Sequence, residues 1–320
     1  MAADTSRRDD RVPDLSIIIV NWNVRDFLLA CLASVHEGAA GLSLEVIVVD
    51  NASSDGSMDA VAERFPHVVQ IRNADNVGFH RANNQGVAVS HGRHVLFLNP
   101  DTRVLEDALP RIVRLMDERP EIGALGPKLL RADLRWSRDN GYRAPSLRTV
   151  LNEYLQISRL LPLPRLFPGM VRSADFHGLE DCEWISGAAF LVRREVVERE
   201  RWNEHEEFFH AADDIQYSAR IRALGWRVMA YADAQVVHYS GQSMAKQDES
   251  FTAHGVSVLP QLLKAREHPV TAWVAIKVIQ VSLLARSYAH RVRYWLSGDA
   301  ASLQKARRLR QYLWLERGNV

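Results

Sequence analysis

The sequence predicts an α/β fold: a Rossmann-like, mostly parallel central sheet flanked by helices, with a C-terminal helical extension. Continuous β-branched runs such as LSIIIV at 15–20 and LEVIVV at 44–49 are typical of strands covered on both faces. Helical patterns separate these runs at the spacing of βαβ units, whose crossovers are right-handed. A basic, partly apolar segment at the end of the chain has the pattern of additional helices.

The predicted elements follow one another in a regular order up to residue 130. Polar breaks and turn residues separate them, and SSDGS at 53–57 offers helix-capping chemistry. Strands are expected at 15–20, 44–49, 68–72 and 94–98, helices at 24–36, 58–65, from 76 onwards and at 105–118, and another apolar segment at 122–130.

The second half of the sheet domain is less regular. Residues 131–180 are punctuated by prolines, as mobile or substrate-specific segments often are. The buried pattern resumes at 183–192, where Gly187 allows close approach of backbone or ligand. The segment 208–214 is expected to open a helix that runs to about residue 224, followed by strand-like segments at 226–231 and 236–238.

Composition is ordinary for a soluble globular protein, with 47% hydrophobic and 25% charged residues in a chain of 320. Residues 1–14 look like a disordered polar tail without the apolar region of a secretory signal, so we expect a cytoplasmic protein. Cys31 and Cys182 have no metal-type spacing, which predicts free buried thiols.

Charge is distributed unevenly along the chain. Residues 261–320 contain 11 Lys and Arg against 3 Asp and Glu, a net charge of +8, whereas the whole chain has a net charge of +1. Within this region, 270–285 contains Lys277 as its single charge; as a helix it would reach roughly 24 Å, short of the roughly 30 Å hydrocarbon core. Basic and aromatic residues follow, a pattern typical of contact with an anionic membrane surface. The alternative is a helical pair packed on its own protein.

Polar clusters stand at the ends of predicted strands: Asn21 to Asn23, Asp50-Asn51, Asn99 to Asp101, and His238. In a parallel sheet the first three converge on the carboxyl edge, where ligands bind. Asp and His side chains there could hold a divalent cation, which a diphosphate recruits to neutralise its charge. Taken singly, Asp50 could equally be a turn former or helix cap, and His238 a partly buried side chain bonded to backbone.

Taken in order, the motifs closely resemble those of family 2 glycosyltransferases, and most closely the bacterial rhamnosyltransferase-like enzymes. The resemblance covers about Leu15 to Gly241. The blocks that carry it are IIIVNWN (17–23), VIVVDNASSDGS (46–57), NVGFHRANNQG (76–86), FLNPDT (97–102), WISGAAFLVRRE (184–195), DDIQYSARIRALGW (213–226) and VVHYSG (236–241).

The resemblance implies a GT-A fold, a nucleotide-sugar donor and an inverting transfer assisted by Mg²⁺ or Mn²⁺. Asp101 is the implied metal ligand, with His238 as a second ligand. Asp214 is the implied base and Asp213 an alternative. The residues implied to bind the donor are Asn21, Asp50, Asn51, Asn76, Gly78, Phe79, Asn83 and Asn99.

The sequence departs from the family pattern beside the base. Relatives usually read Glu-Asp-x-Asp-Leu where this chain reads Asp213-Asp214-Ile215-Gln216-Tyr217, and Arg201-Trp202-Asn203-Glu204 stands in place of the usual Gly-Phe-Asp-Glu. A non-catalytic nucleotide-sugar-binding or scaffold protein with a degenerate segment at 213–217 is therefore the alternative function. A nucleotidyltransferase is less favoured, because the Gly-rich, Lys-bearing loop that such enzymes need after strand one is missing.

We therefore expect a glycosyltransferase that moves a sugar, rhamnose or another deoxyhexose from a dTDP or UDP donor, to a cell-surface glycan or its lipid-linked precursor. Residues 15–241 are expected to form the catalytic domain and 242–320 a helical, basic region. That region is expected to place the protein peripherally on the inner face of the cell membrane. No nucleic-acid partner is expected, and a homo-oligomer is left open.

Overall fold

The computed structural model describes residues 12–137, 143, 145–157, 166, 177–202, 213–239, 259–260, 263–264 and 266–311. The chain divides into two compact units, one formed by Met1–Gly141, Ala174–His205 and Asp214–Gln247 and the other by Tyr142–Ser173, Glu206–Asp213 and Asp248–Val320. Most of the polar tail expected at 1–14 lies outside the described residues, as does the expected boundary at 241/242. The division into domains at 15–241 and 242–320 stays a prediction.

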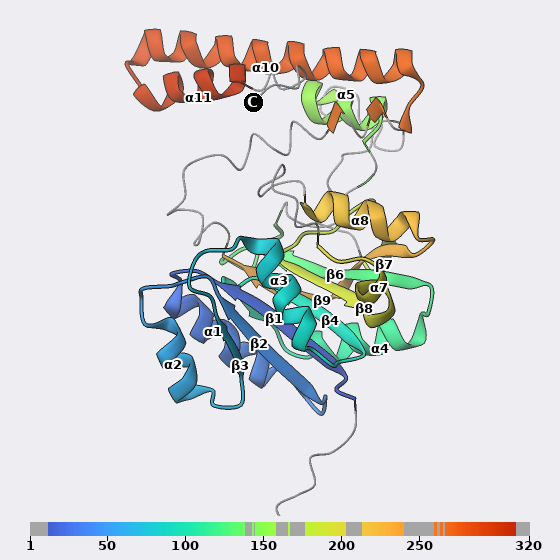
Figure 1. Ribbon diagram of the computed structural model, residues 1–320. Coiled ribbons are helices and arrows are strands. Elements are labelled where there is room, and N and C mark those ends of the chain that lie inside the picture. Colours follow the sequence, from blue (N-terminus) through green and yellow to red (C-terminus); the bar gives the residue numbers. More distant parts are fainter. Residues whose placement is uncertain are drawn as a thin grey trace, which may run out of the picture. The chain divides into compact units, whose positions relative to one another are not determined.

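The first unit is built on a nine-stranded sheet with strand order β3-β2-β1-β4-β8-β6-β9-β5, and β7 pairs with β9 (Figure 1). Its parallel half confirms the expected α/β fold, because β1 runs parallel to both β2 and β4, and β2 runs parallel to β3. The strands are β1 (Leu15–Asn21), β2 (Leu44–Asp50), β3 (Val69–Arg72), β4 (His94–Leu98), β5 (Thr102–Val104), β6 (Ile122–Leu130), β7 (Leu179–Asp181), β8 (Ala189–Arg193) and β9 (Arg227–His238).

Helices cover both faces of this sheet (Figure 1). One face carries α1 (Arg25–Glu37), α2 (Ser57–Arg64) and α4 (Ala108–Glu118), and the other carries α3 (Phe79–Val89), α7 (Arg194–Arg199) and α8 (Asp213–Ala223).

Alternation along β1 divides the core between the two faces. Ile17 and Ile19 belong to the cluster under α1, whereas Ile18 belongs to the cluster under α3. A Cβ at Gly86 of α3 would come within 2.5 Å of Ile18, so glycine lets this helix lie close to β1.

The second half of the sheet mixes directions. β8 runs antiparallel to β4 and β6, and β9 runs parallel to β6 but antiparallel to β5. The buried run expected at 183–192 is a strand only from Ala189, because the residues before it form a turn. The two strand-like segments expected at 226–231 and 236–238 are one continuous strand, β9. The helix expected from 105 starts at Ala108, after the short strand β5.

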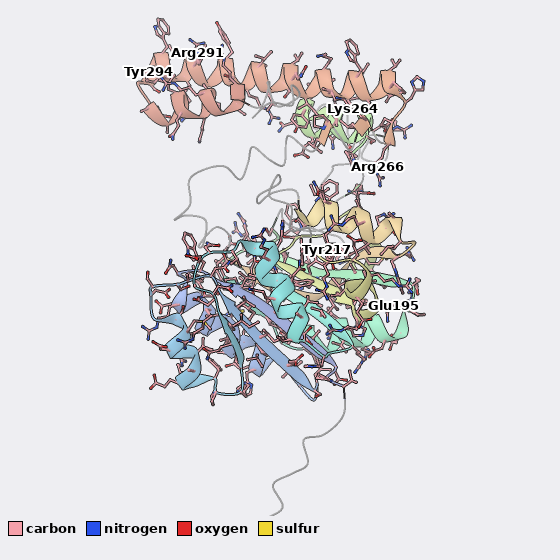
Figure 2. The ribbon with its side chains drawn as sticks, viewed as in Figure 1. Glu195, Tyr217, Lys264, Arg266, Arg291 and Tyr294 are labelled. Carbon is pink, nitrogen blue, oxygen red and sulfur yellow. The ribbon has the colours of Figure 1, made fainter. Side chains whose placement is uncertain are left out.

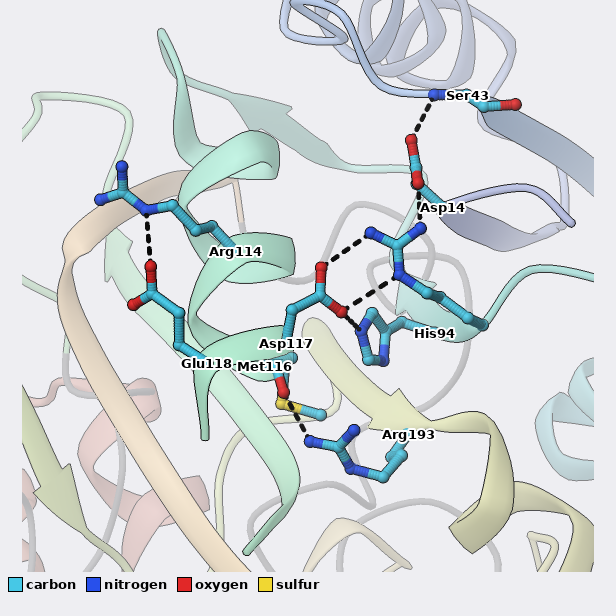
Figure 3. A network of polar contacts seen from close by, with 9 residues as sticks. Asp14, Ser43, His94, Arg114, Met116, Asp117, Glu118 and Arg193 are labelled. Carbon is cyan, nitrogen blue, oxygen red and sulfur yellow. Dashed lines mark hydrogen bonds and ion pairs between the residues drawn. The ribbon is translucent and has the colours of Figure 1, made fainter. Parts of the chain in front are cut away.

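A charged network closes the amino edge of the sheet (Figure 3). Asp117 of α4 accepts hydrogen bonds from Arg93 at 2.7 and 3.1 Å and lies 2.8 Å from Nε2 of His94. Arg93 also pairs with Asp14, whose other carboxylate oxygen accepts from the backbone N–H of Ser43 at 2.8 Å. The network therefore ties the starts of β1, β2 and β4 to α4.

Ionisation in this network follows from the environment of each group. The hydrogen bond from Arg93 holds the pKa of Asp117 below its usual value, with a further contribution from His94. Burial lowers the pKa of His94, because the charged imidazolium would lose its hydration. His94 is consequently held neutral to lower pH than an exposed histidine.

The described helices of the second unit are α5 (Leu147–Leu155), α10 (Pro269–Ser297) and α11 (Ala300–Gln311). Oγ of Ser282 donates to the carbonyl of Tyr154 in α5 at 3.0 Å, and Oγ of Ser287 donates to the carbonyl of Ala306 in α11 at 2.8 Å. These bonds fix both shorter helices along α10.

Helix α10 is longer than the apolar segment 270–285 indicated. It has 29 residues, or about 44 Å at about 1.5 Å per residue, because it continues through the basic and aromatic residues up to Ser297. By length and composition it could cross a membrane, although buried core helices of soluble proteins meet the same criterion.

Candidate functional site

The carboxyl ends of three neighbouring strands bring the predicted polar clusters side by side. In the sheet β1 lies between β2 and β4, and Asn21 at the end of β1 pairs in register with Asp50 at the end of β2. The NPD turn, Asn99-Pro100-Asp101, follows β4 directly. This arrangement is the one expected from a parallel sheet, where ligands bind beyond the carboxyl ends of the strands.

Asn21 and Asp50 form the first pair of the site. Nδ2 of Asn21 donates to Oδ1 of Asp50 at 2.7 Å and lies 2.8 Å from Oγ of Ser57, and both residues of the pair are buried. The other oxygen of Asp50 accepts from the backbone N–H of Ser53 at 2.9 Å. The serines were not among the predicted site residues, although the polar turn at 53–57 that contains them was the available signal.

This contact fixes the orientation of the Asn21 amide. A carboxylate only accepts hydrogen bonds, so the NH₂ group of Asn21 has to face Asp50 and its oxygen has to face away. Oδ1 of Asn21 is buried and accepts no hydrogen bond within the part of the chain that the structure describes. An unsatisfied buried acceptor at this edge is a place for a ligand donor.

A network of side-chain amides lies next to this pair. Asn73 and Gln85 exchange two amide hydrogen bonds of 2.9 Å, and Asn73 also donates to Oδ1 of Asn51 at 3.0 Å. Nδ2 of Asn51 lies 3.3 Å from the carbonyl oxygen of Gly78. The amides thus connect the end of β2 to the start of α3; Asn73 and Gln85 were not predicted.

The loop before α3 has the geometry of a tight polar turn. Oδ1 of Asn76, an exposed residue, accepts from the backbone N–H of Gly78 at 3.0 Å, and Gly78 has φ of 86°, which favours glycine. Asn83 is buried and donates to the carbonyl of Phe79 at 3.0 Å, within α3 itself. Among the predicted donor-binding residues, Asn76 is therefore exposed, whereas the side-chain amide of Asn83 is hydrogen-bonded within α3.

Asp101 and His238 form the second pair. Nε2 of His238 lies 3.4 Å from Oδ1 of Asp101, and Asp101 is 4% exposed. The pairing of β5 with β9 produces this contact, because Thr102 is in register with His238 and the N–H of Tyr239 donates to the carbonyl of Asp101. The two predicted metal ligands, 137 positions apart in the sequence, are neighbours in the structure.

Cys31 lies beneath the same turn. Its thiol is 3.5 Å from Oγ1 of Thr102 and 3.7 Å from the carbonyl of Asn99. Burial, together with the nearby negative charge of Asp101, raises the pKa of Cys31 to about 12. The thiol is consequently unreactive, and both cysteines are free and buried, as the sequence predicted.

Asp214 stands in the first turn of α8 and contacts the turn before β8. Its Oδ2 accepts from the backbone N–H of Gly187 at 3.2 Å, and its Oδ1 accepts from the N–H of Ile215 at 2.8 Å. Ala188, which follows Gly187, accepts at its carbonyl a hydrogen bond of 2.9 Å from the N–H of Asn99. Two backbone contacts therefore connect the predicted base to the turn that bears Asp101. The side chain of Asp213 lies outside the described part of the chain.

Two of the departures from the family pattern, Trp202 and Tyr217, belong to an aromatic core behind this edge. Tyr217 is fully buried, with ring centroids 4.5 Å from Trp202 and 5.4 Å from Phe190, and its hydroxyl donates to the carbonyl of Glu200 at 3.0 Å. Nδ2 of Asn84, from α3, donates to the carbonyl of Trp202 at 2.8 Å. Tyr217 and Trp202 thus have packing roles that their positions beside the base did not reveal.

The donor set at Asp101 fits an open cation site. The carboxylate of Asp101 suits either Mg²⁺ or Mn²⁺, whereas an imidazole ligand such as His238 favours Mn²⁺ over Mg²⁺, which prefers oxygen ligands. Among the described residues, no group of three or more His, Cys, Asp or Glu side chains is arranged to hold a metal. From the described part of the chain, Asp101 and His238 would supply two of the ligands of a cation bound here.

Solved structures with a similar course of the chain identify the class of fold. The mannosyltransferase PcManGT from Pyrobaculum calidifontis, in complex with GDP-Man and Mn2+, matches with a TM-score of 0.58 at 18% identity, covering 96% of this chain and 86% of that one. GalNAc-T7 with UDP, GalNAc and Mn2+ matches with a TM-score of 0.53 at 14% identity, covering 80% and 51%. The protein has the GT-A glycosyltransferase fold.

Sequence comparison then identifies the family. Residues 16–199 match Glycosyl transferase family 2, and the chain belongs to this family. It is 24% identical over 256 residues to the N-acetylglucosaminyl-diphospho-decaprenol L-rhamnosyltransferase of Mycobacterium tuberculosis, covering 75% of this chain and 80% of that protein. It is also 25% identical to the O-antigen biosynthesis protein RfbC of Myxococcus xanthus, covering 72% of this chain and 18% of that protein. The protein is a glycosyltransferase of the rhamnosyltransferase-like type, as the motifs predicted.

Proposed function

We propose that this protein is an inverting, metal-assisted glycosyltransferase that transfers rhamnose or another deoxyhexose from a dTDP or UDP donor. The acceptor is a cell-surface glycan or its lipid-linked precursor. The observation that carries the proposal is the grouping of Asp101, His238 and Asp214 around two connected turns at the carboxyl edge of the sheet. The names of the curated relatives, which include a rhamnosyltransferase and an O-antigen biosynthesis protein, support a role in envelope polysaccharide synthesis.

The donor nucleoside binds at the Asn21–Asp50 pair. Each carboxylate oxygen of Asp50 has accepting capacity beyond its present hydrogen bond, so Asp50 accepts from the ring N–H of the pyrimidine. Oδ1 of Asn21 offers a second buried acceptor beside it. The ribose and diphosphate lie along the residues proposed on the same side: Asn51, Asn76, Gly78, Phe79, Asn83 and Asn99.

Asp101 and His238 hold the divalent cation, Mg²⁺ or Mn²⁺. When bound, the cation supplies positive charge that offsets the negative charge of the leaving diphosphate. Because Asn99 cannot supply the second carboxylate of an Asp-x-Asp pair, the site needs the oxygens of the donor diphosphate. Metal affinity should therefore be low without donor and higher with it.

Asp214 acts as the general base. The acceptor hydroxyl oxygen forms a bond to the anomeric carbon while the bond from that carbon to the diphosphate oxygen breaks on the opposite face. Asp214 takes the hydroxyl proton, and the diphosphate leaves with the bonding electron pair. The N–H of Gly187 orients the carboxylate, and Asp213 is the alternative base.

The protein is proposed to work in the cytoplasm, at the inner face of the cell membrane. The charge of +8 over residues 261–320 supports peripheral contact with anionic lipid. A homo-oligomer is compatible with the proposal, and no nucleic-acid partner is part of it.

The test is an activity assay on purified protein with Mn²⁺, a panel of nucleotide sugars and a lipid-linked acceptor. Wild type should bind and turn over one donor, and Asp101→Ala should lose turnover and the metal dependence of donor binding. Asp133→Ala, which removes an exposed carboxylate after β6, is the matched control and should behave as wild type. Full activity of Asp101→Ala would contradict the metal-assisted mechanism.

A non-catalytic nucleotide-sugar-binding protein is the second candidate, because the segment 213–217 departs from the family pattern. Tyr217 packs into the aromatic core, which gives this departure a structural role. Donor binding without turnover across many acceptors would favour the binding protein instead.

A further inference from the structure

Helix α10 has two faces of different character. The inner face packs on α5 and α11 through residues that are buried at helical spacing: Ala272, Ala275, Ile276, Ile279, Ser282 and Leu283. The opposite face carries a stripe with the spacing of three and four residues that keeps side chains on one side of a helix. We call it the outer stripe: Trp273, Lys277, Val281, Leu284, Tyr288 and Trp295.

The outer stripe is exposed over nearly the whole helix and is mainly apolar, with Lys277 within it and the exposed Arg291 in the same register between Tyr288 and Trp295. Val281 is 62% exposed, Tyr288 68% and Trp295 83%. From Trp273 to Trp295 the stripe spans about 33 Å at about 1.5 Å per residue. An exposed apolar surface of this length marks an interaction site.

Charge selects the kind of partner. Residues 269–311 contain eight Lys and Arg and one acidic residue, Asp299, so this helical pair has a net charge of +7. Arg291 and Tyr294 project from the end of α10 in Figure 2. Exposed tryptophans near both ends, with basic residues beside them, are typical of helices that lie at an anionic lipid surface.

A second copy of the chain fits the outer stripe poorly. If two α10 helices paired in parallel, Lys277 would face Lys277. If they paired antiparallel about Leu284, Lys277 would face Arg291, because both lie seven residues from Leu284. Either arrangement places like charges together in an apolar interface.

A membrane-spanning orientation also fits poorly. Ser282 and Ser287 bind the backbones of α5 and α11, and α11 exposes Lys305, Arg307 and Arg310. A spanning α10 would carry these charges into hydrocarbon, which is unfavourable for each of them.

We propose that α10 lies in the plane of an anionic bilayer, with the outer stripe inserted at the boundary between headgroups and acyl chains. This deepens, and rests on, the peripheral membrane contact in the proposed function. It identifies which face of the protein meets the lipid and how deeply. The inner face, α5 and α11 remain above the apolar layer, and the basic residues reach the headgroups.

The first test measures binding of the full-length protein to vesicles by flotation. Vesicles contain phosphatidylcholine alone or an equal mixture of phosphatidylcholine and phosphatidylglycerol, at low and high salt. Wild type should prefer the anionic vesicles, and Leu284→Ser should lower the partition coefficient about tenfold, since about 1.4 kcal/mol is a factor of ten. Leu224→Ser is the matched control, because Leu224 is 43% exposed and Leu284 is 46% exposed. Equal binding of wild type and Leu284→Ser overturns the proposal.

The second test measures depth. An environment-sensitive thiol label is placed by Trp273→Cys, Leu284→Cys or Trp295→Cys, since the native Cys31 and Cys182 are buried. Lipids brominated at different positions should quench all three labels at the same shallow depth. Deeper quenching at 284 than at 273 and 295 would indicate a spanning helix and overturn the in-plane orientation.

Two controls separate this proposal from its rivals. Sedimentation without vesicles should give the same mass for wild type and Leu284→Ser, whereas a dimer that dissociates in the variant would make the stripe a self-association surface. Turnover of donor with a water-soluble acceptor should be unchanged in Leu284→Ser. Loss of vesicle binding with full turnover leaves the proposed catalytic function intact, so the two proposals can fail separately.

Discussion

The two edges of the central sheet both hold buried or half-buried charged groups, yet they treat them differently. At the amino edge, the carboxylates of Asp14 and Asp117 meet the guanidinium of Arg93. At the carboxyl edge, Asp50 accepts from an asparagine and a backbone amide, and Asp214 accepts from two backbone amides. The carboxylates of the amino edge are thus paired with a guanidinium, whereas Asp50 and Asp214 at the carboxyl edge are oriented by neutral donors.

This difference indicates that the amino edge of the sheet contributes to stability and the carboxyl edge to activity. The hydrogen bond from Arg93 lowers the pKa of Asp117, so this pairing contributes to stability where the carboxyl is ionised. Carboxylates oriented by neutral donors keep their negative charge available to a proton, a metal ion or a base N–H. Substitutions at the carboxyl edge should therefore change activity more than stability, and those at the amino edge should do the reverse.

The largest effect is expected for Asp214→Asn. Loss of a general base should lower kcat by about 10²- to 10⁴-fold while the dissociation constant of the donor stays near that of wild type. Single-turnover kinetics and isothermal titration of donor measure the two quantities. Asp133→Asn serves as the matched control at an exposed carboxylate. A large loss of donor affinity in Asp214→Asn would instead assign the residue a structural role.

The next effect is expected for Asp50→Asn, which replaces a charged acceptor by a neutral amide of the same shape. A hydrogen bond to a charged group contributes about 1.5 to 3 kcal/mol, so the KM for donor should rise roughly 10- to 100-fold with kcat little changed. Thermal unfolding of the same variant separates any loss of stability. Asp59→Asn, on the exposed face of α2, should leave KM unchanged; an unchanged KM in Asp50→Asn would contradict the nucleoside site.

At the amino edge, stability should fall as the solution is acidified. Burial lowers the pKa of His94 in the folded protein, so below about pH 6.5 the unfolded chain binds a proton that the folded protein does not. The free energy of unfolding should decrease by at most about 1.4 kcal/mol per pH unit from this group, between pH 6.5 and the lowered pKa.

Urea unfolding at a series of pH values measures this dependence. His94→Gln should remove the His94 contribution to the slope, and His36→Gln, at an exposed position of α1, should retain it. A slope that is identical in wild type and His94→Gln would show that another group carries the acid sensitivity. The depressed pKa of Asp117 acts in a separate window, because its stabilisation is lost only as the pH falls below about 4.

The smallest effect is expected for Tyr217→Phe. It removes the hydrogen bond to the carbonyl of Glu200 but retains the ring packed against Trp202, so the free energy of unfolding should fall by about 1 kcal/mol. Tyr217→Leu, the residue usual in relatives, also leaves a cavity and should cost about 2 to 4 kcal/mol. Calorimetry compares the pair, and equal losses would indicate that the ring packing contributes little.

The sequence was sufficient to predict the parallel half of the sheet and the positions of its polar strand ends. Local patterns carry that information, because buried strands of a parallel sheet are continuous apolar runs and the polar residues follow them directly. The pairing of Asp101 with His238 was suggested by family resemblance, and the structure explains it by the pairing of β5 with β9.

The features that the sequence did not predict depend on contacts between segments that are distant in the sequence. β5 has three residues and β7 has three, too few for a periodic pattern. The insertion of β8 antiparallel between β4 and β6 is fixed by pairing between strands that are far apart in the sequence, such as His94 with Arg193 and Ala124 with Val192. The contacts of Ser57 with Asn21 and of Gly187 with Asp214 likewise arise from neighbours that only folding brings together; the sequence indicated helix-capping chemistry at 53–57 and close approach at Gly187, but not these partners.

The backbone hydrogen bond that joins the turn of Asn99 to the turn of Gly187 has a consequence for protein engineering. The N–H of Asn99 donates to the carbonyl of Ala188, and the N–H of Gly187 donates to Oδ2 of Asp214. The two turns therefore form one structural unit. A chimaera that takes residues 97–102 from a related enzyme should also take residues 186–190 from that same enzyme. Exchanging one turn alone would disturb the position of the proposed base relative to the proposed metal ligand, even if each turn keeps its own conformation.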